Sequence, residues 1–375
     1  CSLSVLVICS YSIMSILLFL CILLILVLVH EFGHFATAKW FGIRVDEFAF
    51  GFPPRLFGIK RGETTYAFNA LPLGGYVKIY GEDPNEVGDA DRSRSFAAQS
   101  RWVQSAVVLA GIVANMILAW VFFSLTFMVG ITATNEAAAP YRVTDPALSI
   151  IEVSAESPAA TGGLLPGDRI LSIEDAGERV AVSAPGEVTA FIGVREGKPL
   201  TVTYLRQGKE GEATVTPIAG IVPERAAIGI YMDMVGTLQL SFFDALSYGA
   251  QKTYEYTVLT ALGIFDFLKS AVVGRANFTE VTGPVGIVQA VGQAAGIGLG
   301  NLLLFTGLIS INLAVINVLP FPALDGGRFF FILIEAILRR PLTPVVANTL
   351  NLLGFGLLML LMVLVTYHDI ARLIR

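Results

Sequence analysis

Four long apolar stretches constrain the fold of this chain more than any other feature of its sequence. They cover roughly residues 15–35, 103–129, 302–319 and 350–367. Each can cross about 30 Å of hydrocarbon as a helix, because an α-helix rises about 1.5 Å per residue. Charged residues make up only 15% of the chain, against about 25% in ordinary soluble domains. The sequence therefore predicts a membrane α-helical protein with about four transmembrane helices.

The segments between these stretches differ in character. Residues 36–101 contain aromatic and alternating tracts that favour short strands, with turn residues between them. Residues 138–235 have the short strand-like pieces and frequent glycines of a small β-rich domain, and residues 236–300 are aromatic and amphipathic. The expected transmembrane helices are residues 14–35, 102–130, 301–327 and 349–368. A cytoplasmic membrane-associated β region at 36–101 separates the first two helices. An inserted β-rich domain at 138–235 and an amphipathic connecting region at 236–300 separate the second helix from the third.

Basic residues predict the orientation of the chain in the membrane. Short loops rich in Lys and Arg stay on the cytoplasmic side. The loop of residues 328–341 contains three arginines, and residues 36–101 are also basic. Both segments are therefore expected in the cytoplasm, with both termini and residues 131–300 on the other side. The net charge of −5 argues against a nucleic-acid binder, which needs clustered basic residues.

The cysteines and the start of the chain carry little functional information. Cys1, Cys9 and Cys21 all lie in or near the first apolar stretch, so no disulfide framework is indicated. This stretch lacks the basic region and the cleavage site of a signal peptide, so we expect a retained helix. Two starts are compatible with the sequence, Cys1 and Met14.

The motif that points to chemistry is His30-Glu31-Phe32-Gly33-His34, at the end of the first apolar stretch. Helix positions i and i+4 share a face, so both imidazoles can bind one metal ion, with Zn²⁺ as the default. Glu31 can then take a proton from activated water and pass it to the leaving amine. The alternative is a helix end with two interfacial histidines and a capping acid, but burying these groups near hydrocarbon costs several kcal/mol unless a metal compensates.

A third ligand is needed, because catalytic zinc sites use three protein ligands and a water. His368 lies beyond the fourth apolar stretch, on the side of the membrane opposite the motif. Asp325 lies at the cytoplasmic end of the third stretch, at the depth of the two histidines. Prolines and glycines break the helix around it, which lipid tolerates only where backbone is buried in protein or lines a cavity. A helix cap after the proline-rich turn is the alternative role of Asp325.

These two motifs together resemble the site-2 protease family of intramembrane zinc metalloproteases, whose bacterial branch includes the regulator of sigma-E protease. The similarity extends over most of the chain. The segments that carry it further are Phe50-Gly51-Phe52-Pro53-Pro54, Leu73-Gly74-Gly75-Tyr76-Val77, Gly111 with Asn115, and Gly283-Pro284-Val285-Gly286-Ile287. In the family a proline usually follows the glycine of the second helix. This chain has Ile112 there, which leaves the local geometry of that helix open.

The resemblance implies one Zn²⁺ per chain, bound by His30, His34 and Asp325, with Glu31 as the catalytic base and acid. Asn317 matches a polar position that helps to bind substrate or to stabilise the tetrahedral intermediate. A hydrogen bond between helices is an equal alternative for Asn317. The implied process is regulated intramembrane proteolysis in a bacterial cell membrane, of single-span proteins such as anti-sigma factors or of remnant signal peptides.

Two other residue groups have expected roles in the same resemblance. The β region that includes Gly74 and Gly75 is expected to pair with a locally unwound substrate segment. Asn115 is expected to form a structural hydrogen bond between helices.

The inserted domain resembles a PDZ domain of the permuted bacterial type. Ser157-Pro158-Ala159-Ala160 and the segment 163–170 carry this resemblance. A PDZ groove adds an extended peptide to a sheet edge and binds its terminal carboxylate on backbone amides. Ile228, Gly229 and Ile230 are the expected loop of that groove. The alternative is a domain that filters substrates by size and binds no peptide.

Two other functions fit parts of the sequence. A metal-sensing transporter or channel predicts ionisable residues inside the second and fourth apolar stretches, and neither has any in its interior. A catalytically inactive scaffold that acts through the PDZ-like domain predicts loss of Glu31 or of a ligand, yet all four residues are present. The scaffold is therefore kept as the alternative to the peptidase.

Overall fold

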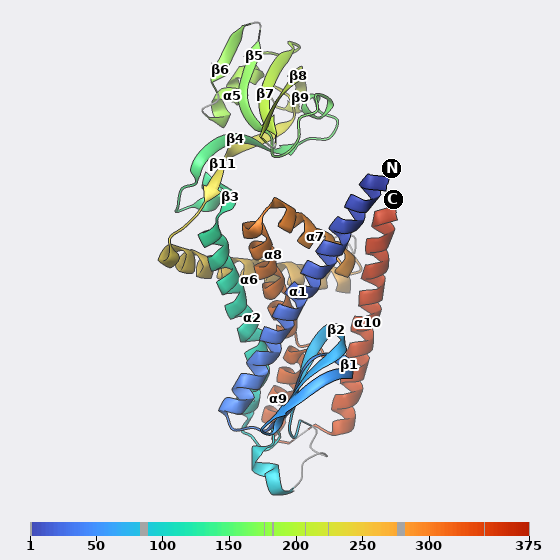
Figure 1. The fold of residues 1–375 in the computed structure, drawn as a ribbon. Helices are drawn as coiled ribbons and strands as arrows, with labels where there is room; N and C mark the ends of the chain where they lie inside the picture. Colours follow the sequence, from blue (N-terminus) through green and yellow to red (C-terminus); the bar gives the residue numbers. More distant parts are fainter. Residues whose placement is uncertain are drawn as a thin grey trace. The chain divides into compact units, whose positions relative to one another are not determined.

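The computed structural model describes residues 2–82, 89–175, 177–181, 184–206, 208–223, 225–275, 282–340 and 342–374, so Cys1 lies outside the described residues. The chain divides into two compact units. The first is Cys1–Thr126 with Phe242–Arg375, and the second is Phe127–Ser241, which is inserted into the first. Figure 1 shows that the first unit is mainly helical and the second mainly β.

Four helices are long and apolar enough to cross a membrane in the described part of the chain. They are α1 (Ser2–Trp40), α2 (Arg101–Val129), α8 (Leu299–Val318) and α10 (Pro344–Ile374). Their number agrees with the sequence prediction. Of the four, α2 is the most deeply packed and α10 the least. Most large apolar side chains of α10 are exposed, as expected of a helix that faces lipid.

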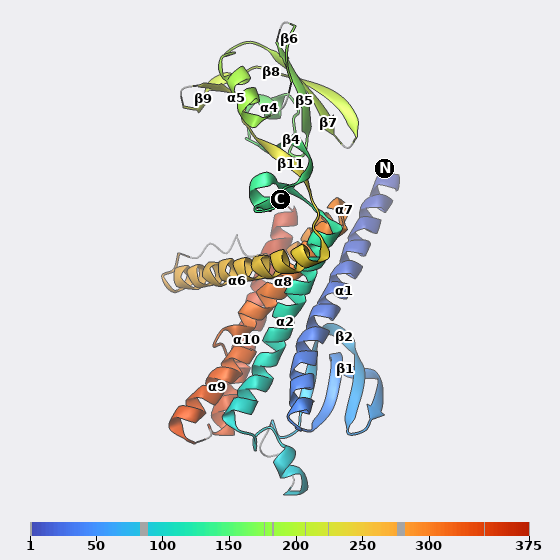
Figure 2. The same ribbon diagram turned by 90° about the vertical axis from the view of Figure 1, so that its left-hand side faces the viewer.

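Three further helices complete the first unit. They are α6 (Phe242–Val272), α7 (Pro284–Ile297) and α9 (Asp325–Leu338). α6 lies across the bundle beside α2, as Figure 2 shows, and the indole N–H of Trp120 donates to the carbonyl oxygen of Leu246 at 2.9 Å. α6 lies in the region where an amphipathic helix is expected, and it is not one of the four candidate spans.

The β region of the first unit consists of β1 (Val45–Arg61) and β2 (Thr64–Ile79). The aromatic and alternating tracts of this region lie in these two strands, and β1 bends so that Tyr66 of β2 is paired with both Phe48 and Ile59. Phe50 is paired with both Gly75 and Phe68. The segment 75–79 therefore pairs with the start of β1 on one side, and no other strand of the described residues pairs with its other side.

A buried apolar cluster joins this sheet to the helices at the lower end of the first unit in Figure 1. Its members come from α1, the strands, the start of α2 and α9, and they include Ala38, Val45, Ile79, Val107 and Ile332. Burial of such side chains contributes about 25 cal/mol per Å² of apolar surface removed from water. The cluster therefore fixes the ends of α1 and α9, which are far apart in the sequence, against one another.

The second unit is built on a seven-stranded sheet of order β3-β11-β4-β5-β7-β8, in which β6 also pairs with β5. The strands are β3 (Ile131–Thr134), β4 (Thr144–Val153), β5 (Arg169–Asp175), β6 (Glu178–Ala181), β7 (Leu200–Arg206), β8 (Lys209–Val215) and β11 (Ile230–Leu238). β9 (Ile218–Val222) and β10 (Arg225–Ala227) form a separate pair.

Short helices close the core of this second unit. They are α3 (Asn135–Ala138), α4 (Pro158–Thr161) and α5 (Pro185–Gly193). The hydroxyl of Ser157 accepts a hydrogen bond from the N–H of Ala160, and Pro158 occupies the first helical position of α4. Both residues favour the start of a helix at this point, which accounts for the Ser-Pro pair in the sequence.

Candidate metal centre

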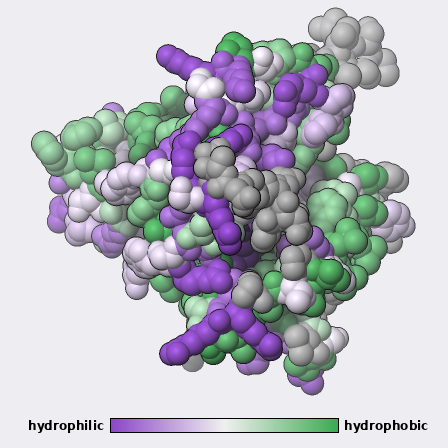
Figure 3. Space-filling view, turned by 90° about the horizontal axis from the view of Figure 1, so that it is seen from below, coloured by the Kyte–Doolittle hydropathy of each residue, from purple (hydrophilic) through white to green (hydrophobic). Residues whose placement is uncertain are grey.

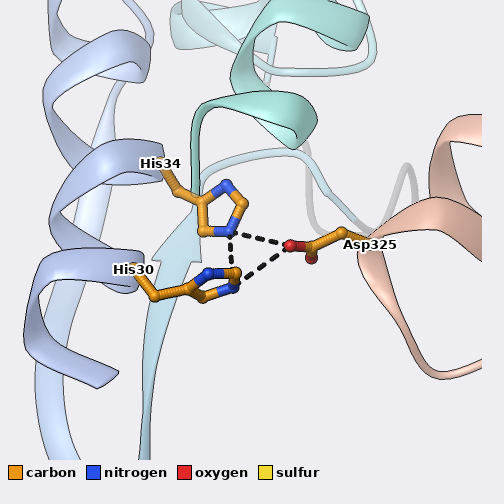
Figure 4. A group of neighbouring side chains, drawn as sticks. All are labelled: His30, His34 and Asp325. Atoms are coloured by element: carbon orange, nitrogen blue, oxygen red, sulfur yellow. Dashed lines mark hydrogen bonds and ion pairs between the residues drawn. The ribbon is translucent and has the colours of Figure 1, made fainter. Parts of the chain in front are cut away.

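His30 and His34 of α1 and Asp325 of α9 point toward one another, as Figure 4 shows. The Nε2 atoms of His30 and His34 lie 3.1 and 3.3 Å from Oδ2 of Asp325. The two Nε2 atoms lie 3.3 Å apart. The three atoms therefore form a nearly equilateral triangle, built from two segments at opposite ends of the chain.

The size of this triangle fits a tetrahedral zinc site. With Zn–N and Zn–O distances of about 2.0–2.1 Å, two ligand atoms of a tetrahedron lie about 3.3 Å apart. Two imidazole nitrogens and one carboxylate oxygen are also a ligand set that Zn²⁺ favours in catalytic sites, with the fourth position left to water. The residues present therefore fit the ion.

The contacts of His34 favour a proton or a metal ion between its Nε2 atom and Oδ2 of Asp325. Nδ1 of His34 lies 2.8 Å from the carbonyl oxygen of Val107, which can only accept, so Nδ1 carries a proton. In a neutral His34, Nε2 then presents a lone pair toward Oδ2 of Asp325, and this buried oxygen has no hydrogen-bond donor of its own. Two electron-rich atoms in buried contact repel each other unless a proton or a metal ion lies between them.

Asn115 of α2 contacts the other ligand. Its amide lies 3.2 Å from Nδ1 of His30, and Oδ1 of Asn115 is buried without a partner. If Nε2 of His30 binds a metal, Nδ1 carries a proton and needs an acceptor. Exchanging the amide oxygen and nitrogen of Asn115 supplies that acceptor and gives Oδ1 its partner. The expected hydrogen bond between helices thus exists, but it is made to a candidate ligand.

Two glycines allow α1 and α2 to approach at this site. A Cβ atom on Gly111 would overlap Nε2 of His34 and lie 2.9 Å from Cε1 of His30. A Cβ atom on Gly33 would overlap the carbonyl oxygen of Ala110. Both imidazoles therefore pack on the backbone of α2. α2 is an unbroken helix through the buried Ile112, so a proline is not required there.

A tight turn between α8 and α9 places Asp325. Ala323 has a left-handed backbone (φ +75°), and its N–H donates to Oδ1 of Asn351 at 3.2 Å. Cβ atoms on Gly326 and Gly327 would overlap the carbonyl oxygens of Val318 and Phe321. The glycines after Asp325 are therefore needed for α9 to start directly against the end of α8, and Asp325 is the first residue of α9.

The three side chains open into a cavity of about 170 Å³. Its lining also includes Glu31, Tyr76, Val77, Ile79, Val108 and Arg328. Glu31 is half-buried, and its Cγ lies 3.3 Å from the position of a Cβ atom on Gly75. Gly75 thus allows β2 to lie against α1 beside the candidate base, while Gly74 packs on the ring of Phe52.

Other predicted site residues lie away from this cavity. Asn317 is in the last turn of α8 and does not line the cavity. Ile228, Gly229 and Ile230 line a separate cavity of about 270 Å³ in the second unit, beside α5. Tyr76, Val107 and Arg328 also line the cavity of the candidate metal centre, although no sequence motif predicts a site role for them. The one signal available for Arg328 was its position three residues after Asp325 in a helix, which places both on one face.

Comparisons with known proteins show which proteins this chain resembles. Residues 18–361 match the model of Peptidase family M50. A predicted zinc metalloprotease of Agrobacterium fabrum is 35% identical, and the alignment covers 95% of each chain. The zinc metalloprotease RasP of Geobacillus kaustophilus is 30% identical, over 96% of this chain and 98% of that one. The PDZ domain of the SdrC-like protein of Listeria monocytogenes is 26% identical over 24% of this chain and 93% of its own, with a TM-score of 0.21.

Proposed function

This chain belongs to peptidase family M50, the site-2 proteases, and is an intramembrane zinc metalloprotease; on this basis we propose that His30, His34 and Asp325 hold one Zn²⁺ and that Glu31 is the catalytic base and acid. The observation that carries the ligand assignment is the triangle of Nε2, Nε2 and Oδ2 atoms, with separations of 3.1 to 3.3 Å. No described feature favours the inactive scaffold, and the four residues proposed for metal binding and catalysis are all present.

The residues of the chain have separable tasks in peptide hydrolysis. Bound Zn²⁺ lowers the pKa of water and polarises a carbonyl group. Val107 and Asn115 hold the two imidazoles with Nε2 directed toward Asp325. Glu31, in the same cavity, takes the proton of the attacking water and passes it to the amine that leaves.

The substrates are membrane proteins, and we propose that they have a single transmembrane segment, such as anti-sigma factors or remnant signal peptides. A helix hides its backbone in internal hydrogen bonds, so the segment to be cleaved must unwind. Among the described residues, β1 is the one strand that pairs with this part of β2, and Tyr76, Val77 and Ile79 line the cavity. This supports a role of β2 in binding the unwound segment as an added strand. Asn317, outside the cavity lining, is proposed only as a support for substrate near the end of α8.

The strand hypothesis has its own test. A charged substitution at Val77, which is only partly buried, should reduce cleavage of a membrane substrate strongly while leaving bound zinc unchanged. The same change at Ile79 should reduce cleavage too, but Ile79 belongs to the buried cluster and its substitution is expected to lower bound zinc as well. Unchanged cleavage would remove the strand-pairing step from the mechanism.

We propose that the chain lies in the cytoplasmic membrane with the metal cavity toward the cytoplasm. Supporting this, the end of the first unit that carries the β region has many hydrophilic residues when viewed from below (Figure 3). The start of α1 and the end of α10 both lie at the other end of that unit (Figure 1). The second unit would then be extracytoplasmic, by the positive-inside rule applied to the loops of the first unit.

For the second unit we propose a PDZ-type peptide groove. β4 pairs with one side of β11, and β3 pairs with the other side only from Val235 to Leu238. Among the described residues, the other side of 230–234 has no strand partner, and it borders the cavity beside α5. An extended peptide can add there, with its terminal carboxylate near the N–H groups of Ile228, Gly229 and Ile230. A peptide-binding measurement on the second unit tests this groove. If no peptide binds, the domain acts instead as a filter that excludes substrates by size.

The central experiment compares the wild-type protein, Glu31→Gln and Asp325→Ala on a tagged single-span substrate, with bound zinc measured on each sample. We expect Glu31→Gln to keep zinc and lose cleavage, and Asp325→Ala to lose both. If Glu31→Gln cleaves at the wild-type rate, or if the wild-type protein holds no metal, the mechanism is wrong and the scaffold function replaces it.

A further inference from the structure

Arg328 lies beside the candidate metal ligands. It follows Asp325 by three residues in the first turn of α9, so the two side chains share one face of the helix. Arg328 lines the cavity of about 170 Å³ that contains the ligands. It also lines a second cavity of about 350 Å³, whose polar lining includes Glu82, Arg101 and Glu335. The side chain therefore stands between two cavities.

Contacts outside the metal cavity hold the guanidinium group of Arg328. One of its nitrogens donates to Oε1 of Glu82, in the segment that follows β2. The guanidinium carbon lies 4.5 Å from the ring centre of Phe96. The side chains of Arg328 and Glu82 are 30% and 42% exposed, so their ion pair is solvated and contributes little to stability. A guanidinium group in such a pair can change partners by rotation about its own side-chain bonds.

In the metal cavity, two carboxylates offset the charge of the proposed Zn²⁺ before any reaction, so a further positive group is useful as negative charge develops. Glu31 and Asp325 both line it, and among its described lining residues Arg328 is the one permanently positive side chain. Hydrolysis adds the water oxygen to the carbonyl carbon and breaks the C–N bond. The products are an amine and a new carboxylate, so negative charge grows at the reacting carbonyl. Charge that develops in such a partly closed site is stabilised mainly by donors already in place.

We propose that Arg328 is a further catalytic residue, which exchanges Glu82 for the oxyanion and then for the new carboxylate of the cleaved bond. The planar guanidinium group suits this task, because its paired N–H donors match the two oxygens of a carboxylate. Glu82 is the competing anion that holds Arg328 beside the cavity between turnovers. The inference rests on the proposed peptidase function.

The test measures both turnover and product binding in the zinc-loaded full-length protein. Product binding compares two forms of the N-terminal cleavage fragment, one ending in a free carboxylate and one in a carboxamide. For Arg328→Gln we expect kcat to fall about 10²–10³-fold, a size typical of losing one oxyanion donor, with KM changed much less and bound zinc unchanged. The preference for the carboxylate fragment over the amide should shrink, and Arg328→Lys should restore part of it.

Three further variants distinguish a catalytic role of Arg328 in the metal cavity from a purely structural role of its salt bridge with Glu82. Arg101→Gln is the matched control, because Arg101 pairs with Glu335 at 2.6 Å in the second cavity but does not line the metal cavity. It should keep the carboxylate preference. Glu82→Gln removes the competitor and should bind the carboxylate fragment several-fold more tightly. The double variant Glu82→Arg with Arg328→Glu restores the salt bridge with its charges exchanged. It places an anion beside the metal cavity, so turnover should stay low.

Two results would overturn the proposal. One is recovery of turnover in the charge-swapped double variant. That result would mean that Arg328 acts only through a structural salt bridge between α9 and the segment after β2. The other is a wild-type carboxylate preference in Arg328→Gln. Failure of the proposed function is a separate outcome, because the wild-type protein itself would then lack zinc or fail to cleave.

Discussion

The orientation of two imidazole rings decides what the candidate centre can bind. Val107 presents a carbonyl oxygen to His34, and Asn115 presents an amide to His30. Each contact fixes which ring nitrogen is available to a metal ion, so part of the metal affinity lies in residues that never touch the metal. Neither contact is visible in the HExxH pattern, because both partners come from another helix.

Removing the acceptor at residue 115 should weaken metal binding. We expect Asn115→Leu to lower zinc affinity about 10–100-fold, because Nδ1 of His30 would then be buried without a partner. Asn115→Asp keeps an oxygen at this point and should stay much closer to the wild-type affinity. Competition with a chelator of known affinity measures both, and equal affinities for the two variants would assign Asn115 to helix packing alone.

The elements around the site are joined by turns and by contacts at their ends. The α8–α9 turn places Asp325, while the long β1–β2 sheet places a strand edge beside Glu31. The sequence predicts both regions in outline. It predicts short strands separated by turns at Pro53-Pro54 and Gly74-Gly75. The pairing agrees with a bend at the prolines, because Tyr66 is paired with both Phe48 and Ile59, which lie on either side of them in β1.

The α8–α9 turn offers a matched pair of substitutions. Gly326→Ala places a Cβ atom on the carbonyl oxygens of Val318 and Leu319, so α9 must shift and Asp325 with it. We expect this variant to lose zinc and cleavage together. Ala323→Gly changes the same turn but suits the positive φ of residue 323, so it should keep both. Zinc content and cleavage of the two purified variants provide the comparison.

The turn of the β1–β2 sheet is tied to the end of α1 by a pH-sensitive contact. Lys39 and Arg94 both donate to Oε1 of Glu63, at 2.5 and 2.8 Å, and the hydrogen bond from Lys39 is the main cause of a lowered pKa of Glu63. A lowered pKa in the folded state means stabilisation that is present above the ordinary Glu value of about 4.3 and is lost as the pH falls through the lowered pKa.

Glu63→Gln should therefore loosen the turn at neutral pH and make no difference at strongly acidic pH. Hydrogen exchange of the β1–β2 segment in the wild-type protein and in this variant measures the difference at each pH. Added salt should reduce it, because the group is largely solvated. A difference that grows as the pH falls would contradict the assignment.

At the scale of the whole molecule, the two units are separate folds with separate cores. The core of the second unit includes Leu148, Ile173, Leu200 and Ile228, which share no members with the cluster beside the metal centre. Within the second unit, Asp168 is 1% exposed. Both of its carboxylate oxygens accept from Arg206, at 2.6 and 2.7 Å. Its main role is therefore to fix the loop before β5 to β7.

Arg206→Ala should destabilise the second unit selectively. It leaves the buried carboxylate of Asp168 without its cation, which destabilises the fold around it. Limited proteolysis should then cut within residues 127–241 at a lower temperature than in the wild-type protein, while bound zinc is unchanged. Arg206→Lys keeps the charge and should be intermediate. Loss of zinc from Arg206→Ala would show that the two units depend on each other.

Sequence patterns predict this molecule well where the signal is local. The apolar stretches predict the candidate spans, and helical spacing brings His30 and His34 together. The choice of Asp325 as the third ligand is predicted from its expected depth in the membrane, which matches that of the two histidines. Asn115, Tyr76 and Arg328 become visible only when helices and strands far apart in the sequence are packed together. Asn317, whose residue type suggested a direct role, lies outside the cavity lining.

Asp325 comes much later in the sequence than the two histidines, and this separation determines when the metal centre can form. His30 and His34 leave the ribosome early, whereas Asp325 follows after most of the chain has been made. A nascent chain that lacks α9 offers a metal ion two nitrogens and no carboxylate from this cluster. On the proposed ligand set, the metal centre is therefore complete only after α9 has met α1.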